Sequence, residues 1–239
     1  MRRFYDAQSF SLGSESTLSE EASHHISRVL RMQPGDELVL FNGDGGEWLA
    51  RISAVTKRQV CVVPLQHLAD NRTPDARLHV ALPLLKGDRM DYALQKATEL
   101  GAASFQLLTT ERTEVRVDGG RLDKRLPHWQ QVVISACEQC GMNLVPPVLA
   151  PAPLQDWLSQ PRQGLALVAH PGEQPLDRDS LKQATDIHLL TGPEGGFSDA
   201  ELRLADDSGF RSFALGNRVL RAETAPPALM AAIWMARQP

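Results

Sequence analysis

From Leu78 onward the sequence alternates short apolar segments with stretches of helical periodicity, and this alternation is what most constrains the fold. Leu78–Leu82 is typical of a buried strand. After Asp88 the apolar residues recur at the spacing of one helix face, and Gly101 stands where a left-handed glycine commonly ends a helix. Phe105–Leu108 predicts the next strand.

The alternation continues to the end of the chain. A long helical stretch reaches Gly141, and three more short apolar segments occupy residues 165–169, 187–190 and 212–215. Short buried strands separated by helices are typical of a parallel sheet that is covered on both faces. We therefore expect an α/β domain with a mostly parallel sheet.

The first third of the chain is β-rich. A helix is expected at Glu20–Leu30. Three strands follow it, at residues 37–41, 48–55 and 60–68. The Asn-Gly turn sequence at 42–46 predicts hairpins that close into a small barrel. Residues 69–77 are polar, contain a proline and lack periodicity, so we interpret them as a linker. Domains are expected at residues 1–72 and 73–239.

Composition places limits on location and partners. Apolar residues make up 42% of the chain, and no apolar run approaches the roughly 18 residues that span a bilayer. The N-terminal MRRFYDAQSF lacks the apolar core of a secretory signal, so we expect a cytoplasmic protein with no membrane contact. The net charge is −4, whereas a generic nucleic-acid binder is basic. Any RNA must therefore be bound by a local cluster and by shape.

The three cysteines are too few for a disulfide framework. Cys137 and Cys140 form a CxxC sequence, but no second pair completes a four-ligand zinc site. The helical periodicity around them predicts that both sulfurs pack on one buried face. We expect no metal site.

Three of the expected strands end in unusual loops, and ligands of open parallel sheets bind at the carboxyl ends of strands. The first loop, His170-Pro171-Gly172, is by itself an ordinary turn. The second, Thr191–Phe197, has three glycines in five residues, so its backbone can approach a ligand closely. Ser198 and Glu201 then form a capping box that begins a helix.

The chemistry of the second loop argues against a phosphate ligand. It lacks the lysine of a phosphate-binding loop, and its Glu194, which we expect to be buried, would repel a phosphate. A neutral or cationic ligand, such as a sulfonium cofactor, suits it better.

The third loop runs from Leu215 to Ala225. Thr224 is expected to cap the last helix, and the two prolines after Ala225 fall in its first turn, where a missing N–H costs little. The loop interleaves three charged residues with apolar ones, namely Arg218, Arg221 and Glu223. Charges are costly to bury without partners, so we interpret this spacing as functional.

These residues resemble the RsmE family of small-subunit ribosomal RNA uridine N3-methyltransferases, within the SPOUT superfamily. The motifs TGPEGGFS (191–198) and LGNRVLRAETA (215–225) carry the resemblance most specifically. The helix sequence KGDRMDYALQKATELG (86–101), the stretch ACEQCG-x-N-x-x-P (136–146) and the pairing of MRRFY with HHISRVLRM (24–32) match as well. The chain departs from the family pattern at Met142 and Leu144, where arginines are common, and at Pro226-Pro227.

The resemblance implies a C-terminal SPOUT domain with a deep trefoil knot, preceded by a small PUA-like β-barrel that helps to hold RNA. It also implies a homodimer with the active site at its interface, and S-adenosylmethionine bound in a bent form by the three loops. The implied cofactor-binding residues are His170, Leu190, Thr191, Gly192, Glu194, Gly195, Gly196, Leu215, Gly216, Val219, Leu220, Ala222 and Thr224.

Methyl transfer to a uracil N3 requires that the methyl group and N3 be aligned and that N3 lose its proton. We expect Arg221, and after it Arg218, to stabilise the negative charge that develops on the uracil. Glu194 and Glu223 are candidate bases, although Glu223 can instead pair with Arg221 to order the loop. The target base must also leave any stack to reach the methyl group.

The remaining expectations concern partners. Ribosomal RNA is expected to contact Arg2, Arg3, Arg28, Arg31 and Asn143. The last helix carries more apolar residues than one core-facing stripe needs, which predicts a homodimer; they are Met230, Ile233, Trp234 and Met235. Two alternatives remain open: a methyltransferase of the same superfamily that acts on transfer RNA or on a ribose hydroxyl, and a non-catalytic RNA-binding assembly factor.

Overall fold

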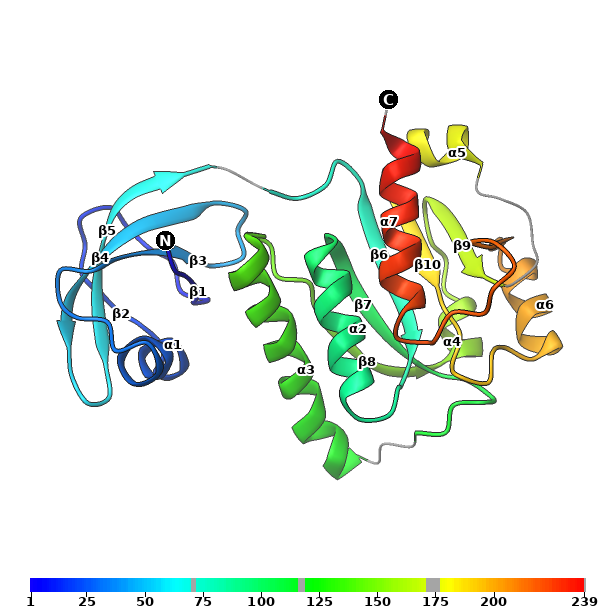
Figure 1. The fold of residues 1–239 in the computed structure, drawn as a ribbon, viewed down its shortest axis with the longest axis horizontal. Coiled ribbons are helices and arrows are strands. Elements are labelled where there is room, and N and C mark those ends of the chain that lie inside the picture. The colour runs from blue at the N-terminus through cyan, green and yellow to red at the C-terminus, as the bar shows by residue number, and fades with distance from the viewer. Residues whose placement is uncertain (70–71, 116–118, 171–176, 239) are drawn as a thin grey trace. The chain divides into compact units, whose positions relative to one another are not determined.

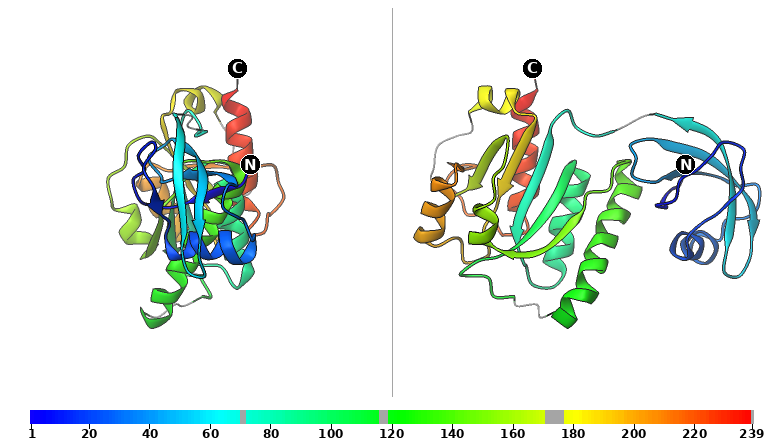
Figure 2. Two further views of the ribbon diagram at one scale, coloured as in Figure 1. Left: turned by 90° about the vertical axis from the view of Figure 1, so that its left-hand side faces the viewer. Right: turned by 180° about the vertical axis from the view of Figure 1, so that it is seen from behind.

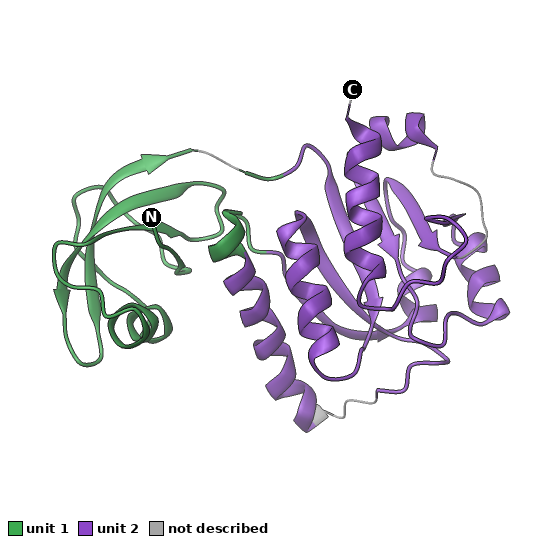
Figure 3. Ribbon diagram, in the orientation of Figure 1, with its two compact units in different colours: residues 1–73, 137–145 green, residues 74–136, 146–239 purple. Residues whose placement is uncertain are grey.

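The computed structural model describes residues 1–69, 72–115, 119–170 and 177–238. The chain divides into two compact units (Figure 3). Unit 1 consists of residues 1–73 and 137–145, and unit 2 of residues 74–136 and 146–239.

Unit 1 is a bent, half-barrel sheet with one helical segment. Its elements are β1 (Arg3–Tyr5), β2 (Ser16–Thr17), α1 (Glu20–His24), the π-helical turn η1 (His25–Val29), β3 (Glu37–Phe41), β4 (Glu47–Val55) and β5 (Val60–Leu68). The strand order is β1-β3-β4-β5-β2, with β1 parallel to β3 and the other pairs antiparallel. Register shifts between β4 and β5 bend the sheet around a core that includes Phe4, Ile26 and Leu38.

The helix expected at Glu20–Leu30 is present, but only its first part is α-helical. Ser19 caps its start, because its side chain accepts a hydrogen bond from the backbone N–H of Ala22. Further along, the Ser27 hydroxyl donates to the Ser23 carbonyl at 2.7 Å. Such side-chain bonds compete with the regular helical pattern, and the chain continues from His25 as a π-helical turn.

Residues 137–145, which we expected in the C-terminal domain, pack within unit 1. The backbone N–H of Tyr5 donates to Glu138 Oε1 at 3.0 Å, and the Arg3 guanidinium donates to the Gly141 carbonyl at 3.3 Å. The N-terminal strand thus holds the end of α3 and the turn after it. Contacts distant in sequence, which periodicity does not report, account for the difference.

Unit 2 contains the parallel sheet. Its elements are β6 (Arg77–Pro83), α2 (Asp88–Glu99), β7 (Ala102–Thr109), α3 (Gly119–Cys140), β8 (Val148–Pro153), α4 (Leu154–Leu158), β9 (Leu165–Ala169), α5 (Arg178–Gln183), β10 (Asp186–Leu190), α6 (Asp199–Asp207), β11 (Arg211–Phe213) and α7 (Ala225–Arg237). The strand order is β11-β9-β10-β6-β7-β8, and every neighbouring pair is parallel. The expected parallel sheet is confirmed.

Helices cover both faces of this sheet (Figures 1 and 2). On one face, α2 and α7 contribute buried side chains such as Met90, Leu94 and Ile233. On the other, α4 and α6 pack in an apolar cluster that includes Trp157 and Ala205. Gly101 has φ +82° after α2, so the expected left-handed end of that helix is confirmed.

The last helix does not carry the apolar surplus that we predicted. Met230 and Ile233 are fully buried in the core of unit 2. Trp234 is half-buried, and its indole N–H donates to the Leu100 carbonyl at 2.6 Å. Of the four apolar residues predicted to form an interface, only Met235 is exposed, at 63%, because α7 packs against both the sheet and α2. Within the described residues, no helix is long and apolar enough to cross a membrane.

Candidate active site

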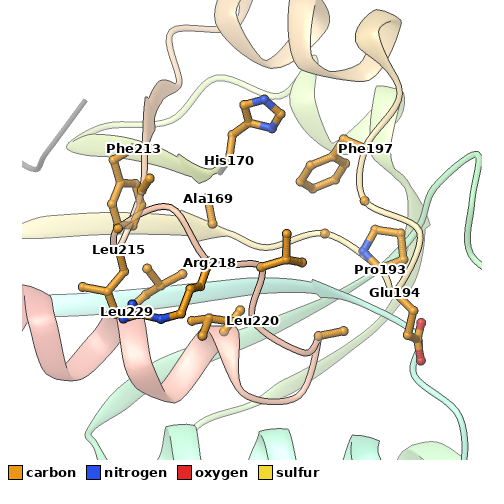
Figure 4. A pocket seen from close by; sticks show the side chains of 17 residues that line it. Ala169, His170, Pro193, Glu194, Phe197, Phe213, Leu215, Arg218, Leu220 and Leu229 are labelled. Atoms are coloured by element: carbon orange, nitrogen blue, oxygen red, sulfur yellow. The ribbon is translucent and has the colours of Figure 1, made fainter. Parts of the chain in front are cut away.

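A pocket lies at the carboxyl ends of β9, β10 and β11, where the three unusual loops meet the start of α7 (Figure 4). It encloses about 720 Å³, including the solvent at its open mouth. Its walls are formed by Ala169, His170, Gly192, Pro193, Glu194, Gly196, Phe197, Phe213, Ala214, Leu215, Gly216, Arg218, Val219, Leu220, Ala222, Ala225 and Leu229. The cavity thus lies at the edge of the sheet where parallel α/β domains bind their ligands. Pro171 and Gly172 of the first loop lie outside the described residues.

The second loop, after β10, is held in a defined shape. The Gly196 N–H donates to the Pro193 carbonyl at 2.8 Å, and Gly196 has φ +67°, which favours glycine. The predicted capping box is confirmed, since the side chains of Ser198 and Glu201 each accept from the other's backbone N–H. The loop therefore passes directly from the pocket wall into α6.

The loop after β7 fixes the second loop from outside the pocket. Arg112 Nη1 donates to the Gly195 carbonyl at 2.8 Å, and the Glu111 N–H donates to Glu201 Oε1 at the same distance. A Cβ atom at Gly195 would lie 3.3 Å from the Arg112 side chain. Gly195 therefore allows a close approach of Arg112, and the approach to the cofactor that we expected of it stays a prediction.

The third loop passes from β11 into α7. Gly216 has φ +77°, and the N–H groups of Thr224 and Ala225 both donate to the Arg221 carbonyl. Thr224 is at the N-cap position, but its side chain makes no capping bond. The expected cap fails because an N-cap side chain accepts from the second or third helical N–H, and these positions are Pro226 and Pro227, which have none.

The charged residues of these loops are more exposed than we predicted. Arg218 and Arg221 are both exposed, and so is Glu194 at the pocket rim. The cost of burying unpaired charge therefore does not apply to them, and the burial expected for Glu194 is wrong. Arg218 and Glu194 line the pocket, whereas Arg221 lies outside its lining. Of the charged group, Glu223 alone is largely withdrawn from solvent, its side chain being 15% exposed.

Arg89 joins two of the candidate carboxylates, and sequence reasoning missed it. Its Nη1 lies 3.3 Å from Glu194 Oε1, and its Nε lies 3.9 Å from Glu223 Oε1. Glu223 therefore pairs with Arg89, and no ion pair joins it to Arg221 within the described part of the chain. The available signal was an arginine two residues after Gly87, in the first turn of a helix that follows a strand.

Most of the implied cofactor residues line the pocket, and four of them do not. Leu190 and Thr191 are fully buried, Gly195 faces Arg112, and Thr224 lies outside the lining. The first two end a central strand, so their side chains serve the core. Sequence reasoning in turn missed apolar walls at the strand ends and on α7, namely Phe197, Phe213 and Leu229.

The pocket suits a nucleoside that carries a positive charge. Phe197, Phe213 and Leu229 offer apolar surface for a purine, and glycine backbone lies open beside them. Glu194, which also lines the pocket, offers a carboxylate to a cationic ligand. The residues present therefore fit S-adenosylmethionine.

Two of the residues expected to contact RNA are internal in unit 1. The Arg3 side chain is 9% exposed and pairs with the buried carboxylate of Glu47. Arg3 also donates to Asn143 Oδ1, and Asn143 is fully buried. Because a buried carboxylate requires a cation nearby, Arg3 and Asn143 have a structural role, and we withdraw both as RNA contacts. Arg2, Arg28 and Arg31 are exposed.

The cysteines agree with the packing interpretation. Cys137 is fully buried, and burial raises the pKa of its thiol far above the usual range. Cys140 is half-buried. No cluster of three metal-ligating side chains occurs in the described ranges.

This combination of a small mixed half-barrel and a parallel sheet with a nucleoside-sized pocket defines an RNA methyltransferase. Two family models agree: an RNA methyltransferase domain matches residues 71–234, and an RNA methyltransferase PUA domain matches residues 18–65. The expected fold class, a SPOUT-type parallel domain after a PUA-like sheet, is confirmed in its sheet architecture.

Comparison with related proteins identifies the family within the RNA methyltransferases. Ribosomal RNA small subunit methyltransferase E of Synechocystis is 34% identical over 91% of this chain and 72% of its own length. The Bacillus subtilis protein of that name is 30% identical, over 91% and 88%. A crystal structure of the Neisseria gonorrhoeae enzyme bound to S-adenosyl methionine has a TM-score of 0.92 and 34% identity, covering 98% and 97% of the two chains. A Legionella pneumophila protein solved with SAM reaches 0.94 at 40% identity, with the same coverage. The chain belongs to the ribosomal RNA small subunit methyltransferase E family.

Proposed function

We propose that the protein methylates N3 of one specific uridine in small-subunit ribosomal RNA, with S-adenosylmethionine as the methyl donor. The observation that carries this proposal is the pocket at the carboxyl edge of the sheet. Its apolar walls and open glycine backbone suit that cofactor, and its described lining residues include no buried cation that would repel a sulfonium. When bound, the cofactor supplies the methyl group.

The residues around the pocket divide the remaining tasks. Phe197, Phe213 and Leu229 surround the nucleoside with apolar surface, and the second and third loops offer main-chain groups to it. Arg221 and Arg218 are the side chains that we assign to the uracil carbonyls, because both are exposed cations of the third loop. A cation there stabilises the negative charge that appears as N3 loses its proton.

The two units have different roles in this proposal. Unit 1 is the PUA-like domain that holds RNA through Arg2, Arg28 and Arg31, and unit 2 is the methyltransferase domain. The protein acts as a homodimer in the cytoplasm. Light scattering at micromolar concentration tests the dimer, and a fully active monomer would contradict it.

Isotope transfer tests the reaction. The protein is incubated with methyl-labelled S-adenosylmethionine and either small ribosomal subunits or naked 16S RNA, and the RNA is digested to nucleosides. The expected product is 3-methyluridine at a single position. Label on a ribose hydroxyl or on transfer RNA would support another methyltransferase of the superfamily. RNA binding without any labelled product would support a non-catalytic assembly factor.

A further inference from the structure

Arg89, in the first turn of α2, lies between two carboxylates that come from two different loops of the pocket. It is 3.3 Å from Glu194 and 3.9 Å from Glu223. Glu194 lines the pocket, and Glu223 lies between two residues that line it, Ala222 and Ala225. Arg89 therefore joins the loop after β10 to the loop after β11 beside the cofactor site.

The two carboxylates differ in solvation. The Glu194 side chain is 29% exposed, so water can reach its oxygens. The Glu223 side chain is only 15% exposed, and its Oε2 is buried with no hydrogen-bond partner among the residues that the structure describes. A buried carboxylate oxygen without a donor is unfavourable. Because Oε2 is buried and Glu223 is not among the lining residues of the pocket, this points to a donor that reaches Glu223 when RNA binding shifts the loop after β11.

Arg89 occupies the other side of that carboxylate. Its Nε faces Glu223 Oε1, so Oε2 is left as the acceptor. A base with one oxygen oriented by a third group and the other free is the arrangement that proton abstraction requires. Arg218 and Arg221 contact no carboxylate in the described part of the chain, so they are available for carbonyl oxygens.

We propose that Glu223 is the catalytic base that accepts the N3 proton of the target uracil, and that Arg89 is the positioning residue that orients it. This assignment rests on the proposed function. The N3–H bond breaks, its electron pair stays on the uracil ring, and the proton joins Oε2 of Glu223. The carboxyl later releases that proton to water.

Turnover and cofactor affinity are measured separately for each variant. Glu223→Gln removes the base and keeps the shape, so it lowers single-turnover methylation by roughly 100-fold or more. Arg89→Gln lowers it by about 10-fold or more, and Arg89→Lys recovers part of the loss because it restores the charge without the planar geometry. Calorimetry shows cofactor affinity within about threefold of wild type for all three. Lys86→Gln, which breaks an exposed ion pair between the segment before α2 and Glu114 in the loop after β7, leaves both quantities unchanged.

A double-mutant cycle tests whether Arg89 acts through Glu223. If it does, Arg89→Gln changes turnover by less than about threefold once Glu223 is already Gln, because no base is left to orient. Losses that multiply in the double variant would overturn the positioning role. A loss confined to the KM for RNA would make Arg89 an RNA contact and would overturn it as well.

A binding experiment tests, without any turnover, whether the Glu223 carboxylate accepts a hydrogen bond from N3 of the target base. The methylated uridine is first mapped with the wild-type protein, and an RNA fragment with cytidine at that position is then compared with the uridine form, both in the presence of S-adenosylhomocysteine. Cytosine N3 is an acceptor, so it opposes the Glu223 carboxylate, and wild type prefers uridine by about 10-fold. Glu223→Gln can donate to cytosine N3, so its preference for uridine is smaller than that of wild type, and the part that remains reflects the arginines at the uracil O4.

The outcomes separate this inference from the proposed function. No 3-methyluridine from the wild-type protein would defeat the proposed function itself. Methylation by wild type together with near-normal turnover in Glu223→Gln, or an unchanged preference for uridine in that variant, would overturn the base assignment alone.

Discussion

Arg218 and Arg221 lie three residues apart in the loop after β11, but only Arg218 lines the pocket. Both are exposed and neither forms an ion pair with another described residue. Arg218, in the pocket wall, can contact the cofactor as well as the uracil, whereas Arg221, outside the lining, is assigned to the uracil alone. The two arginines are therefore expected to affect different steps.

Arg221→Ala should lower turnover far more than cofactor affinity, because its charge meets the uracil as N3 loses its proton. Loss of one such group typically costs on the order of 100-fold. Arg218→Ala is the matched comparison and should weaken cofactor binding as well. Single-turnover kinetics and calorimetry measure the two effects. A parallel loss of cofactor affinity in Arg221→Ala would make it a residue that orders the loop.

Gly196 has φ +67° in the pocket wall, and an added Cβ would meet nothing within 4 Å. Gly196→Ala should therefore lower cofactor affinity by about 5-fold or more, since left-handed strain of about 1–2 kcal/mol is relieved by moving the loop. Gly209→Ala provides the control: Gly209 has φ +83°, equally open space and no part in the pocket. Its stability should fall similarly in thermal melts while cofactor binding is kept. Equal binding losses in both variants would indicate general destabilisation.

At the residue scale, the sequence placed the ligand loops correctly because glycine and capping patterns are local. It misjudged Arg3, Asn143 and Glu194, because burial and pairing depend on contacts distant in the chain. Arg3 reaches the buried Glu47 and Asn143, which no local pattern indicates. Arg89 was missed for the same reason, since its two carboxylates lie more than 100 residues away.

At the scale of elements, the long helices and the central strands were predictable because their apolar residues repeat with a clear period. β8, VLAPAP, was missed because it contains two prolines, which are tolerated there because β8 is an edge strand. β1 and β2 are too short to show a period, and their pairing is set by β3 and β5. The deep trefoil knot that the resemblance implies stays a prediction.

The last turn of α3 carries a carboxyl group whose protonation should affect stability. Burial raises the pKa of Glu138 above its usual range, more than the hydrogen bond from the Tyr5 N–H lowers it. The ionised form is therefore disfavoured in the folded state. The destabilising effect of ionised Glu138 is absent well below about pH 4.3, where its carboxyl is protonated in both the folded and the unfolded state. The free energy of unfolding falls as pH rises from there through the raised pKa of the folded state.

Glu138→Gln removes that charge and keeps an oxygen that accepts from the Tyr5 N–H. We expect its Tm to exceed that of wild type by about 1–3 °C at pH 7, with the difference disappearing near pH 4. Thermal melts by circular dichroism across this pH range measure it. Asp123→Asn, at an exposed position of the same helix, controls for the loss of one negative charge. A lower Tm for Glu138→Gln at pH 7 would mean that attraction to Arg3 and His25 outweighs burial.

At the scale of the whole molecule, a net charge of −4 means that RNA cannot be held by overall electrostatic attraction. The burial of Arg3 and Asn143 leaves Arg2, Arg28 and Arg31 as the exposed positive side chains of unit 1 that we assign to RNA. Arg28 lies in the π-helical turn, and Arg31 has φ +54°, a conformation that few non-glycine residues adopt. The positions of these two arginine side chains thus depend on local backbone geometry that the sequence did not reveal.

Replacing Arg28 and Arg31 together by Gln in the intact protein should weaken RNA binding and leave cofactor binding unchanged, because every pocket residue belongs to unit 2. If both side chains contact phosphate, the slope of log affinity against log salt should flatten by roughly 0.7 to 0.9 per lost contact. The control replaces Lys182 and Arg203, two exposed cations of unit 2, by Gln, which changes the net charge equally. Filter binding of the RNA fragment from about 50 to 200 mM salt measures both slopes. A flattened slope in the control variant alone would show that the RNA contacts lie in unit 2. Unchanged slopes with unchanged affinity in both variants would mean that none of the four side chains contacts RNA.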